Sequence, residues 1–552
     1  MVEIATPTAT GATRLVEMLE QLRVELVFGL PGVHNLPIWK ALSDSDIRLV
    51  GVRHEQTAAY AADGYARATG RLGVALVTTG PGAANTLGAT GEAMAAGSPV
   101  LVIATDTSTA LRREGVYRGT LHETRDQTAM FVPVTKAARQ VGSAEKIGDA
   151  VLDAGLAALA APTGPVYLGI PTNLLSQAVA SAPPTSPRAP SPTPLEPPVG
   201  VERACELLAS AKRPLIWAGG GALRGGAGAA VGELAIMLAA PVITTFMGRG
   251  LLAPDHPCAV PGPAHAPEVG RLWDEADVVL AIGTDLDGTN TQNWQMPRPP
   301  ALIGINVDEA DANKSYACDV TLVGDARAVV GQLLGRVEAR DGLGELKARL
   351  AQIGSSVRAW VWQDCDQAAA LLEIVERVLP SETIVVTDMC IPGYWLAGYW
   401  QVPRPRKLGY PLGWGTLGFG FPASLGAGLA GAGPTVCVVG DGGFMYACGE
   451  LATVVQERIP LTIVLVDDGG YGMLRFDQVL AGEEPFGVDL VAPDFNALAA
   501  SFGVPSTTVE GFGPEFEREL KLSLAAGEPR MLVVRARLKP PPTTSPRWYR
   551  RP

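Results

Sequence analysis

Short apolar runs alternate with longer stretches of helical periodicity through the first part of the chain. Four of these runs are rich in β-branched or aliphatic side chains: Leu26–Gly29, Val74–Thr78, Val100–Ala104 and Val166–Ile170. Runs of this length and composition are typical of buried strands. Strands that alternate with helices predict a parallel sheet covered by helices, so we expect a first α/β domain at residues 1–180.

A proline-dense segment interrupts this pattern between residues 182 and 200, where the sequence reads APPTSPRAPSPTPLEPPVG. Such a composition predicts a stiff, extended linker and therefore a domain boundary. The alternation resumes in a second unit at residues 199–342, with strands expected at Pro214–Ala218, Pro241–Thr245, Val278–Gly283 and Ala301–Val307.

Residues 343–370 predict a connecting helical segment, and a third unit is expected at residues 371–552. Its predicted strands are Thr383–Thr387, Pro434–Val439, Leu461–Val466 and Arg530–Arg535. The first and third units are similar in size and layout, which suggests a duplicated architecture. The chain as a whole is therefore expected to be α/β, with three doubly wound parallel-sheet domains.

The composition agrees with three packed domains and narrows the function. Of the 552 residues, 47% are hydrophobic and 64 are glycine, which is typical of a well-packed protein with many tight turns. The 44 basic and 56 acidic residues give a net charge of −12. Without an excess of positive charge, nucleic-acid binding loses its electrostatic driving force, so we expect no such partner.

The sequence gives no indication of export or membrane insertion. The N-terminus lacks a basic stretch followed by an apolar one, so no secretory signal is expected. Residues 408–440 are uncharged, but Pro411, Pro422 and Pro434 favour a buried loop, helix and strand over a membrane span. Seven cysteines form no CxxC pair, which favours a reducing, cytoplasmic location.

Two acidic, glycine-rich turns follow neighbouring strands of the third unit. Gly440-Asp441-Gly442-Gly443-Phe444 comes after one strand, and Asp467-Asp468-Gly469-Gly470-Tyr471-Gly472 comes after the next. Parallel strands present their carboxyl ends at one edge of a sheet, where open α/β folds bind ligands. Carboxylates beside exposed backbone N–H groups suit Mg²⁺ that bridges a diphosphate. GDGG by itself is also typical of an ordinary turn, so the prediction depends on both turns together.

The two turns and their spacing resemble the signature of thiamine-diphosphate-dependent enzymes. The resemblance implies that Asp441 and Asp468 are side-chain ligands of Mg²⁺ and that the carbonyl of Gly470 is a third ligand. It further implies that the cofactor lies against Gly442, Gly443, Phe444, Tyr471, Gly472 and Met473. Where the family usually has Asn-Asn, this chain has Asp467-Asp468, which adds negative charge beside an anionic cofactor.

In the first unit, Val52-Arg53-His54-Glu55-Gln56 ends a short strand and opens an alanine-rich helix. An acidic residue there also has an ordinary explanation in the helix dipole. With Phe28-Gly29-Leu30-Pro31-Gly32 before it and a Thr79-Gly80-Pro81-Gly82 turn after it, however, Glu55 resembles the glutamate of the pyrimidine-binding domain. The resemblance implies that a buried Glu55 activates the cofactor. Pro31, Gly32, Glu55, Thr79 and Asn85 are the expected cofactor-binding residues of this unit.

The resemblance also concerns how the cofactor is bent and where the site forms. In Gly413-Trp414-Gly415-Thr416-Leu417-Gly418, Leu417 would be the apolar wedge under the cofactor, with Gly415 beside it, although a leucine is also ordinary core. In the family, each active site forms between domain one of one subunit and domain three of another. A homodimer or homotetramer is therefore expected.

Two positions differ from acetohydroxyacid synthases, which otherwise share most of these motifs. Where they carry a Phe-Gln-Glu triplet, the corresponding stretch here runs from Gly119 to Gln127, and neither His122 nor Glu123 is that glutamine. Asp477 stands where they have a tryptophan. The stretch from Phe28 to Asn35, together with LHE..DQ.AM, is more similar to the 5-guanidino-2-oxopentanoate decarboxylase branch. His34 resembles the histidine of benzaldehyde lyase, in the superfamily that includes benzoylformate decarboxylase. His34, His122 and Glu123 are therefore candidate catalytic residues beside Glu55.

Ile303–Asp308 and Val323–Ala326 resemble the middle domain of the acetohydroxyacid synthase group. Gly219–Ala222 forms a glycine turn, but Thr284–Asn290 lacks the arginine of the FAD-containing synthases, so FAD is not expected. The leading hypothesis is a non-oxidative 2-oxo acid decarboxylase or carboligase that forms a C2 carbanion and an enamine. Its partners would be a 2-oxo acid and an aldehyde acceptor. Acetolactate synthase and a catalytically silent homologue remain the alternatives.

Overall fold

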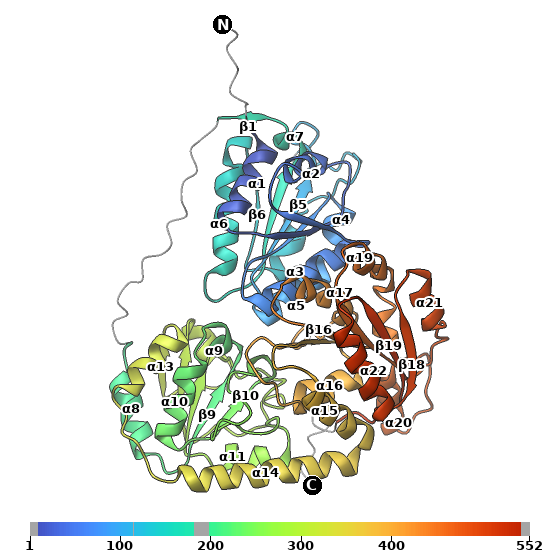
Figure 1. The fold of residues 1–552 in the computed structure, drawn as a ribbon. Coiled ribbons are helices and arrows are strands. Elements are labelled where there is room, and N and C mark those ends of the chain that lie inside the picture. The colour runs from blue at the N-terminus through green and yellow to red at the C-terminus, as the bar shows by residue number, and fades with distance from the viewer. Residues whose placement is uncertain (1–8, 114, 181–197, 542–552) are drawn as a thin grey trace.

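A computed structural model describes residues 9–113, 115–180 and 198–541. It shows three α/β bodies, the first at the top of Figure 1, the central one at the lower left and the third at the lower right. The predicted linker between residues 182 and 200 and the basic, proline-rich tail at 539–552 lie mostly outside the described residues. The prediction of three parallel-sheet α/β units is confirmed.

The first body is built on a sheet of six parallel strands in the order β3-β2-β4-β5-β7-β6. The helices that matter for the site are α3 (Glu55–Thr69) and α5 (Leu87–Ala96). α1 (Gly11–Gln21), α2 (Leu36–Leu42) and α6 (Ile147–Leu159) are its other longer helices. The strands are β2 (Leu26–Gly29), β3 (Arg48–Gly51), β4 (Gly73–Val77), β5 (Val100–Asp106), β6 (Ala137–Gln140) and β7 (Val166–Pro171).

The third body repeats this strand order. Its sheet runs β15-β14-β16-β17-β19-β18, so in both bodies the strands lie in the chain order second, first, third, fourth, sixth, fifth. This repetition agrees with the expected duplication. The strands are β14 (Ile384–Thr387), β15 (Leu408–Gly409), β16 (Thr435–Gly440), β17 (Leu461–Asp467), β18 (Ser506–Glu510) and β19 (Arg530–Arg535).

The central body has five parallel strands in the order β10-β9-β11-β12-β13. α14 (Leu343–Asp364) then runs along the bottom of the molecule to the third body (Figure 1). α15 (Asp366–Val378) follows at once, so residue 371, the expected start of the third unit, lies inside a helix. The central strands are β9 (Pro214–Ala218), β10 (Val242–Thr244), β11 (Val278–Ile282), β12 (Ala301–Asn306) and β13 (Val320–Val323).

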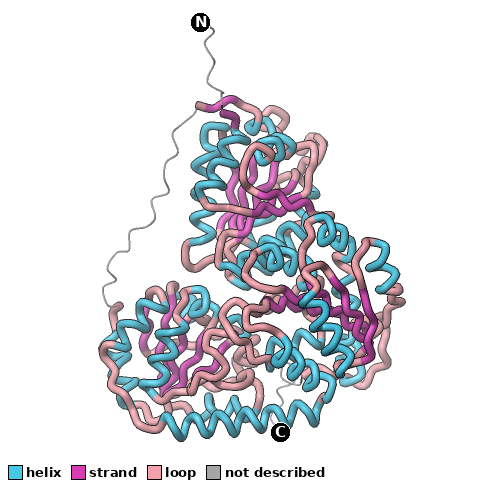
Figure 2. Tube along the Cα trace, in the orientation of Figure 1, coloured by secondary structure: helices cyan, strands magenta, loops and turns pink. Residues whose placement is uncertain are grey.

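Helix, strand and loop are coloured separately in Figure 2, where helices flank each sheet. The uncharged stretch 408–440 contains β15, a loop, α17 (Gly420–Leu429) and β16, as predicted. In the part of the chain that the structure describes, no helix combines the length and apolar character needed to cross a membrane. All seven cysteines have free thiols.

The first and third bodies meet through α3 and α17, which pack without room for a side chain at two points. A Cβ atom on Gly64 would overlap the carbonyl of Ala423, and one on Gly426 would overlap the carbonyl of Ala61. The residue numbers rise along one helix as they fall along the other, so the two helices are antiparallel. Glycine permits this close approach of backbones.

Candidate active site

Two carboxylates lie at the carboxyl edge of the third sheet. Asp441 begins a short helix directly after β16, and Asp468 follows β17, the neighbouring strand. Asp441 is 3% exposed. Its Oδ2 atom and the Oδ1 atom of Asp468 are buried and accept no hydrogen bond from any residue that the structure describes. Buried carboxylate oxygens need a compensating charge, so this pair fits a divalent cation.

The electrostatics of Asp468 agree with this arrangement. Burial, and then the negative charge of Asp441, raise the pKa of Asp468 to about 6. Burial also raises the pKa of Asp441. A nearby like charge disfavours ionisation, whereas a bound cation would favour it. The positive charges of Arg475 and Arg537 act in the opposite direction on Asp468, so the protein offsets part of this negative charge.

The backbone around these carboxylates leaves little room for side chains. A Cβ atom on Gly442 would lie 2.8 Å from the Tyr471 ring, and one on Gly443 would lie 3.0 Å from Oδ2 of Asp388. The same position on Gly442 is 3.6 Å from the carbonyl oxygen of Gly470. Phe444 is instead buried in the core, 5.0 Å from the ring of Phe421. Glycines here keep the backbone open to a diphosphate.

The turn after Asp468 leads into α20 (Gly472–Leu480). The backbone N–H of Tyr471 donates to the carbonyl of Val488 at 2.8 Å, which ties this turn to the segment after the helix. Met473 packs against a small aromatic cluster of Phe246, Tyr394 and Tyr410. Tyr471, Gly472 and Met473 thus directly follow the turn of Asp468, and their contact with a cofactor stays a prediction.

Asp388 is a residue of this site that the sequence analysis missed. It directly follows β14, is fully buried, and accepts the backbone N–H groups of Gly418 at 3.0 Å and Gly420 at 3.1 Å. Burial raises its pKa to about 6. It thereby joins the loop of residues 413–418, which contains Leu417, to the turn at Gly443. The signal was available, because Asp388 follows a strand at the same sheet edge as Asp441.

The predicted wedge, Leu417, lies beside the Gly443 turn, and its role stays a prediction. Its Cδ1 atom is 3.3 Å from the position of a Cβ on Gly443. Its loop rests on the first body of the same chain, where the hydroxyl of Thr416 donates to Glu92 at 3.2 Å. Glu92 is buried and pairs with Arg67 at 3.1 Å. Gly415 lies beside Met389, whose Cε is 3.8 Å from the position of a Cβ there.

Glu55 begins α3, on a different surface of the first body. The side-chain amide of Asn85 donates to its Oε2 atom at 3.0 Å, and Gly82 lies close to its other oxygen. Pro31 is exposed, and a Cβ on Gly32 would lie 2.6 Å from Thr78. Glu55 itself is half-exposed. The expectation that Glu55 is buried is therefore not met within the part of one chain that the structure describes.

His34 and His122 come together on this surface from positions 88 residues apart in the sequence. Their ring centroids are 5.3 Å apart and nearly perpendicular. Nδ1 of His34 lies 2.9 Å from the hydroxyl of Thr79, which in turn donates to Thr105 at 2.9 Å. Burial and the neighbouring His122 lower the pKa of His34, so its ring is neutral near pH 7.

Glu123, next to His122, makes contacts of a different kind from those of the two histidines. Oε2 of Glu123 accepts the backbone N–H groups of Arg118 and Thr120, at 3.1 and 2.9 Å, so its carboxylate holds its own loop. Gln127, which the sequence analysis did not single out, accepts the N–H of Gly80 at 2.7 Å and donates to Tyr167. The geometry thus favours His34 and His122 over Glu123 as chemical groups.

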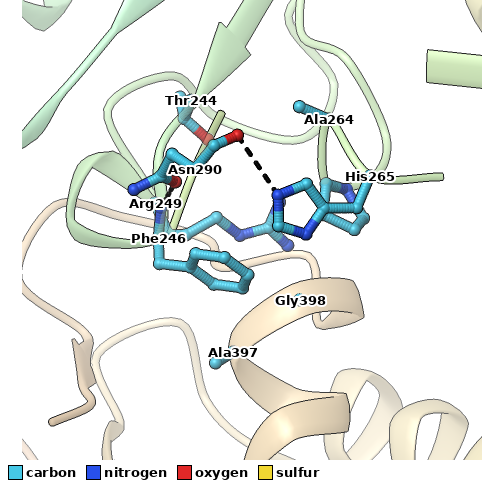
Figure 3. A pocket seen from close by; sticks show the side chains of 9 residues that line it. Thr244, Phe246, Arg249, Ala264, His265, Asn290, Ala397 and Gly398 are labelled. Carbon is cyan, nitrogen blue, oxygen red and sulfur yellow. Dashed lines mark hydrogen bonds between the residues drawn. The ribbon is translucent and has the colours of Figure 1, made fainter. Parts of the chain in front are cut away.

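A small cavity lies elsewhere, between the central and third bodies (Figure 3). His265 lines it and lies 3.2 Å from the carbonyl of Asn290, while Arg249 and Phe246 form another side. Arg249 also donates to the carbonyl of Trp400 across the joint between the bodies. The cavity includes none of the predicted catalytic or cofactor-binding residues.

The glycine turn of the central body lies at the switch point of its sheet, between β9 and β11. A Cβ on Gly221 would lie 2.8 Å from the backbone of Gly283, and the N–H of Gly221 donates to the Gly283 carbonyl at 2.8 Å. Asp285 in the following stretch pairs with Lys314 at 2.7 Å. Close backbone packing explains these glycines, and the absence of FAD stays a prediction.

Sheet order, paired carboxylates and the Glu55 surface together define a known class of enzyme. Three segments match the thiamine pyrophosphate enzyme profiles: the N-terminal TPP binding domain at residues 9–130, the central domain at 201–333 and the C-terminal TPP binding domain at 388–534. Thiamine pyrophosphate is the same compound as thiamine diphosphate. The chain belongs to the thiamine pyrophosphate enzyme family.

Similar proteins cover almost the whole chain. A probable 2-ketoarginine decarboxylase of Pseudomonas aeruginosa is 36% identical over 96% of this chain and 94% of that protein. A probable acetolactate synthase large subunit of Methanococcus aeolicus is 30% identical over 95% of this chain and 91% of that protein. The acetolactate synthase isozyme 3 large subunit of Escherichia coli is 31% identical over 90% and 88%. The chain is thus a lyase or carboligase of this cofactor class.

Proposed function

We propose that the protein is a thiamine-diphosphate- and Mg²⁺-dependent non-oxidative 2-oxo acid decarboxylase or carboligase. The observation that carries the cofactor assignment is the pair of unpartnered, buried carboxylate oxygens beside the Gly442-Gly443 turn. Asp441, Asp468 and the Gly470 carbonyl would hold the cation, and the two glycines and Leu417 would hold the cofactor. When bound, thiamine diphosphate supplies the carbon that adds to a ketone and accepts the electrons left by CO₂.

Residues of the first body would carry out the proton transfers. Asn85 fixes one oxygen of Glu55, which leaves Oε1 to exchange a proton with the pyrimidine ring. The contact between His34 and Thr79 occupies Nδ1, which leaves Nε2 of the neutral ring to transfer a proton to or from the substrate. His122, edge-on to His34, would complete this group, whereas Glu123 would only hold the loop.

We further propose that Glu55 serves the cofactor of a second copy of the chain. Arg67, at the other end of α3, donates to the carbonyl of Tyr410 at 2.7 Å and lies 4.6 Å from the Phe419 ring, next to the wedge loop. Glu55 precedes Arg67 by twelve residues, which is about 18 Å along a helix. Glu55 and Leu417 of one chain therefore lie at opposite ends of the α3–α17 pair.

Two exposed apolar surfaces support association with another copy. Val33, Leu121 and Val132 are each more than 60% exposed on the first body, and Phe486 and Val491 are almost fully exposed after α20. Apolar exposure of this kind marks interaction surfaces. A homodimer or a homotetramer would cover them and bury Glu55.

We propose the limits 1–180, 199–342 and 371–552 for the three domains. We also propose a cytoplasmic location, which suits the seven free thiols.

The proposed substrate class rests on the similar proteins and on two positions that differ from the acetolactate synthases. The relative from Pseudomonas aeruginosa is named for a guanidino 2-oxo acid, so 5-guanidino-2-oxopentanoate is the first candidate substrate. Acetolactate synthesis is the second candidate, because several relatives carry that name. His122 and Asp477 disfavour it, since both replace residues of the synthases. A catalytically silent homologue is the remaining alternative. It would require that Asp441 and Asp468 keep the cofactor out, whereas two neighbouring carboxylates suit a bound cation.

One experiment tests the cofactor and the reaction together. Circular dichroism with thiamine diphosphate and Mg²⁺ should report binding, and a panel of 2-oxo acids should release CO₂ and the corresponding aldehyde. Pyruvate should give no acetolactate. Glu55→Gln should bind the cofactor and lose CO₂ release. Failure of the wild type to bind thiamine diphosphate would refute the proposed function, and acetolactate formation would favour the second candidate.

A further inference from the structure

The proposed cation site of this chain has two aspartates, Asp441 and Asp468, and therefore more negative charge than a site with one aspartate. Asp441 is almost fully buried, and the side chain of Asp468 is 15% exposed. One oxygen of each accepts no hydrogen bond from the described residues. Both residues follow adjacent parallel strands, so their carboxylates share one sheet edge. Two neighbouring carboxylates, each with a buried oxygen that accepts no hydrogen bond from the described residues, are costly unless a cation lies between them.

The nearby arginines contact the backbone of the Asp468 turn more closely than they contact its carboxylate. Arg475, on α20, donates to Asp489 at 2.7 Å and to the carbonyl of Gly469 at 3.1 Å, and its closest approach to the Asp468 carboxylate is 4.0 Å. Arg537 donates to the main-chain carbonyl of Asp468 at 3.3 Å. These contacts fix the turn by its backbone. The carboxylates of Asp468 and Asp441 are close enough for their charges to interact.

From this arrangement we infer that the site binds a divalent cation on its own, without the diphosphate, and that Asp468 makes this possible. The inference rests on the proposed function for the position of the site. With an amide at position 468, the protein would offer one charge, and the diphosphate would have to supply the rest. With two carboxylates, the protein alone matches the charge of a divalent ion.

The donors also indicate the kind of cation. Asp441, Asp468 and the carbonyl of Gly470 are all oxygen ligands. Within the described ranges, no group of three or more histidine, cysteine or acidic side chains forms a metal cluster, so nitrogen and sulfur ligands are not gathered here. Oxygen ligands favour Mg²⁺, Mn²⁺ or Ca²⁺ over zinc or copper. Mn²⁺ is the useful probe, because free Mn²⁺ can be measured by electron paramagnetic resonance.

The test is a titration of the cofactor-free, full-length protein with Mn²⁺, followed by competition with Mg²⁺. Wild type should bind one Mn²⁺ per chain. Asp468→Asn should weaken this binding by about tenfold or more, because ligand charge sets affinity in such sites. Asp467→Asn is the matched control, since it removes the adjacent, half-buried carboxylate from the end of β17. It should change the affinity by less than about threefold, because Asp467 is not a ligand.

Two results would overturn the inference. One is a wild type that binds Mn²⁺ only when thiamine diphosphate is added, a measurement that needs no variant to fold. The other is an equal loss of Mn²⁺ affinity in Asp467→Asn and Asp468→Asn, which would show that any nearby negative charge has the same effect as Asp468. A parallel titration with thiamine diphosphate and Mg²⁺ separates the two proposals. Binding there, without binding of Mn²⁺ alone, would leave the proposed function intact and refute only the cation-first order.

Discussion

If each active site takes Glu55 from one chain and Asp441 from another, two inactive variants should restore activity when they share a dimer. Glu55→Gln removes the activating carboxylate, and Asp441→Ala removes a ligand of the cation. In a mixed dimer, one site contains both changes and the other contains neither. If both residues served the same chain, each site would contain one change and no site would be intact.

The expected magnitude follows from the geometry of α3 and α17. The antiparallel contacts at Gly64 and Gly426 place Glu55 near the end of α17, whereas Leu417 and the turn of Gly443 lie near its start. A gap of about 18 Å along α3 is too large for proton transfer within one chain. In a symmetric dimer, one of the two equivalent sites is then intact, so turnover should be about half that of wild type.

The assay uses co-expression of the two variants with different affinity tags and purification through both. CO₂ release is then measured with the best 2-oxo acid from the screen. Each variant as a homodimer should be inactive, and wild type carrying both tags gives the reference activity. The mixed species should also bind about half the thiamine diphosphate of wild type, because only one of its sites keeps Asp441.

A mixed dimer with no more activity than the two homodimers would refute the shared site, provided that its size and folded content match wild type. Glu55 would then have to serve its own chain. That result would require a large movement of α3 relative to α17, against the close backbone packing seen between them.

Three further substitutions, the first with a matched control, test the geometry. Gly64→Ala should lower stability by about 1–3 kcal/mol in thermal melts, because its new methyl overlaps α17; Gly331→Ala, on α13 (Ala326–Leu334) and facing open space, should raise it by about 0.5–1 kcal/mol. Equal effects would contradict the packing. His34→Ala should lower kcat by about 10²-fold or more while thiamine diphosphate affinity stays unchanged. Asp388→Asn, whose amide faces an N–H donor, should weaken cofactor binding measured by calorimetry; unchanged affinity would remove its positioning role.

The sequence by itself determined the three α/β units and the acidic, glycine-rich turns at Asp441 and Asp468, because both depend on local rules. Apolar runs between helices mark parallel strands, and parallel strands bring their carboxyl ends to one edge. Asp441 and Asp468 were therefore predictable from two strand ends. Asp388 obeys the same rule but lacks a run of glycines beside it. Short or polar edge strands such as β6 and β18 were missed, since they carry little hydrophobic signal.

Only the tertiary structure decided how these parts act together. His34 meets His122 because a loop from far along the chain folds over Gly80, and Glu123 proves to hold that loop. The direction of α3 against α17 sets Glu55 apart from Leu417, although both belong to the same expected site. Such relations depend on contacts between residues distant in sequence, and no local pattern of side chains encodes them.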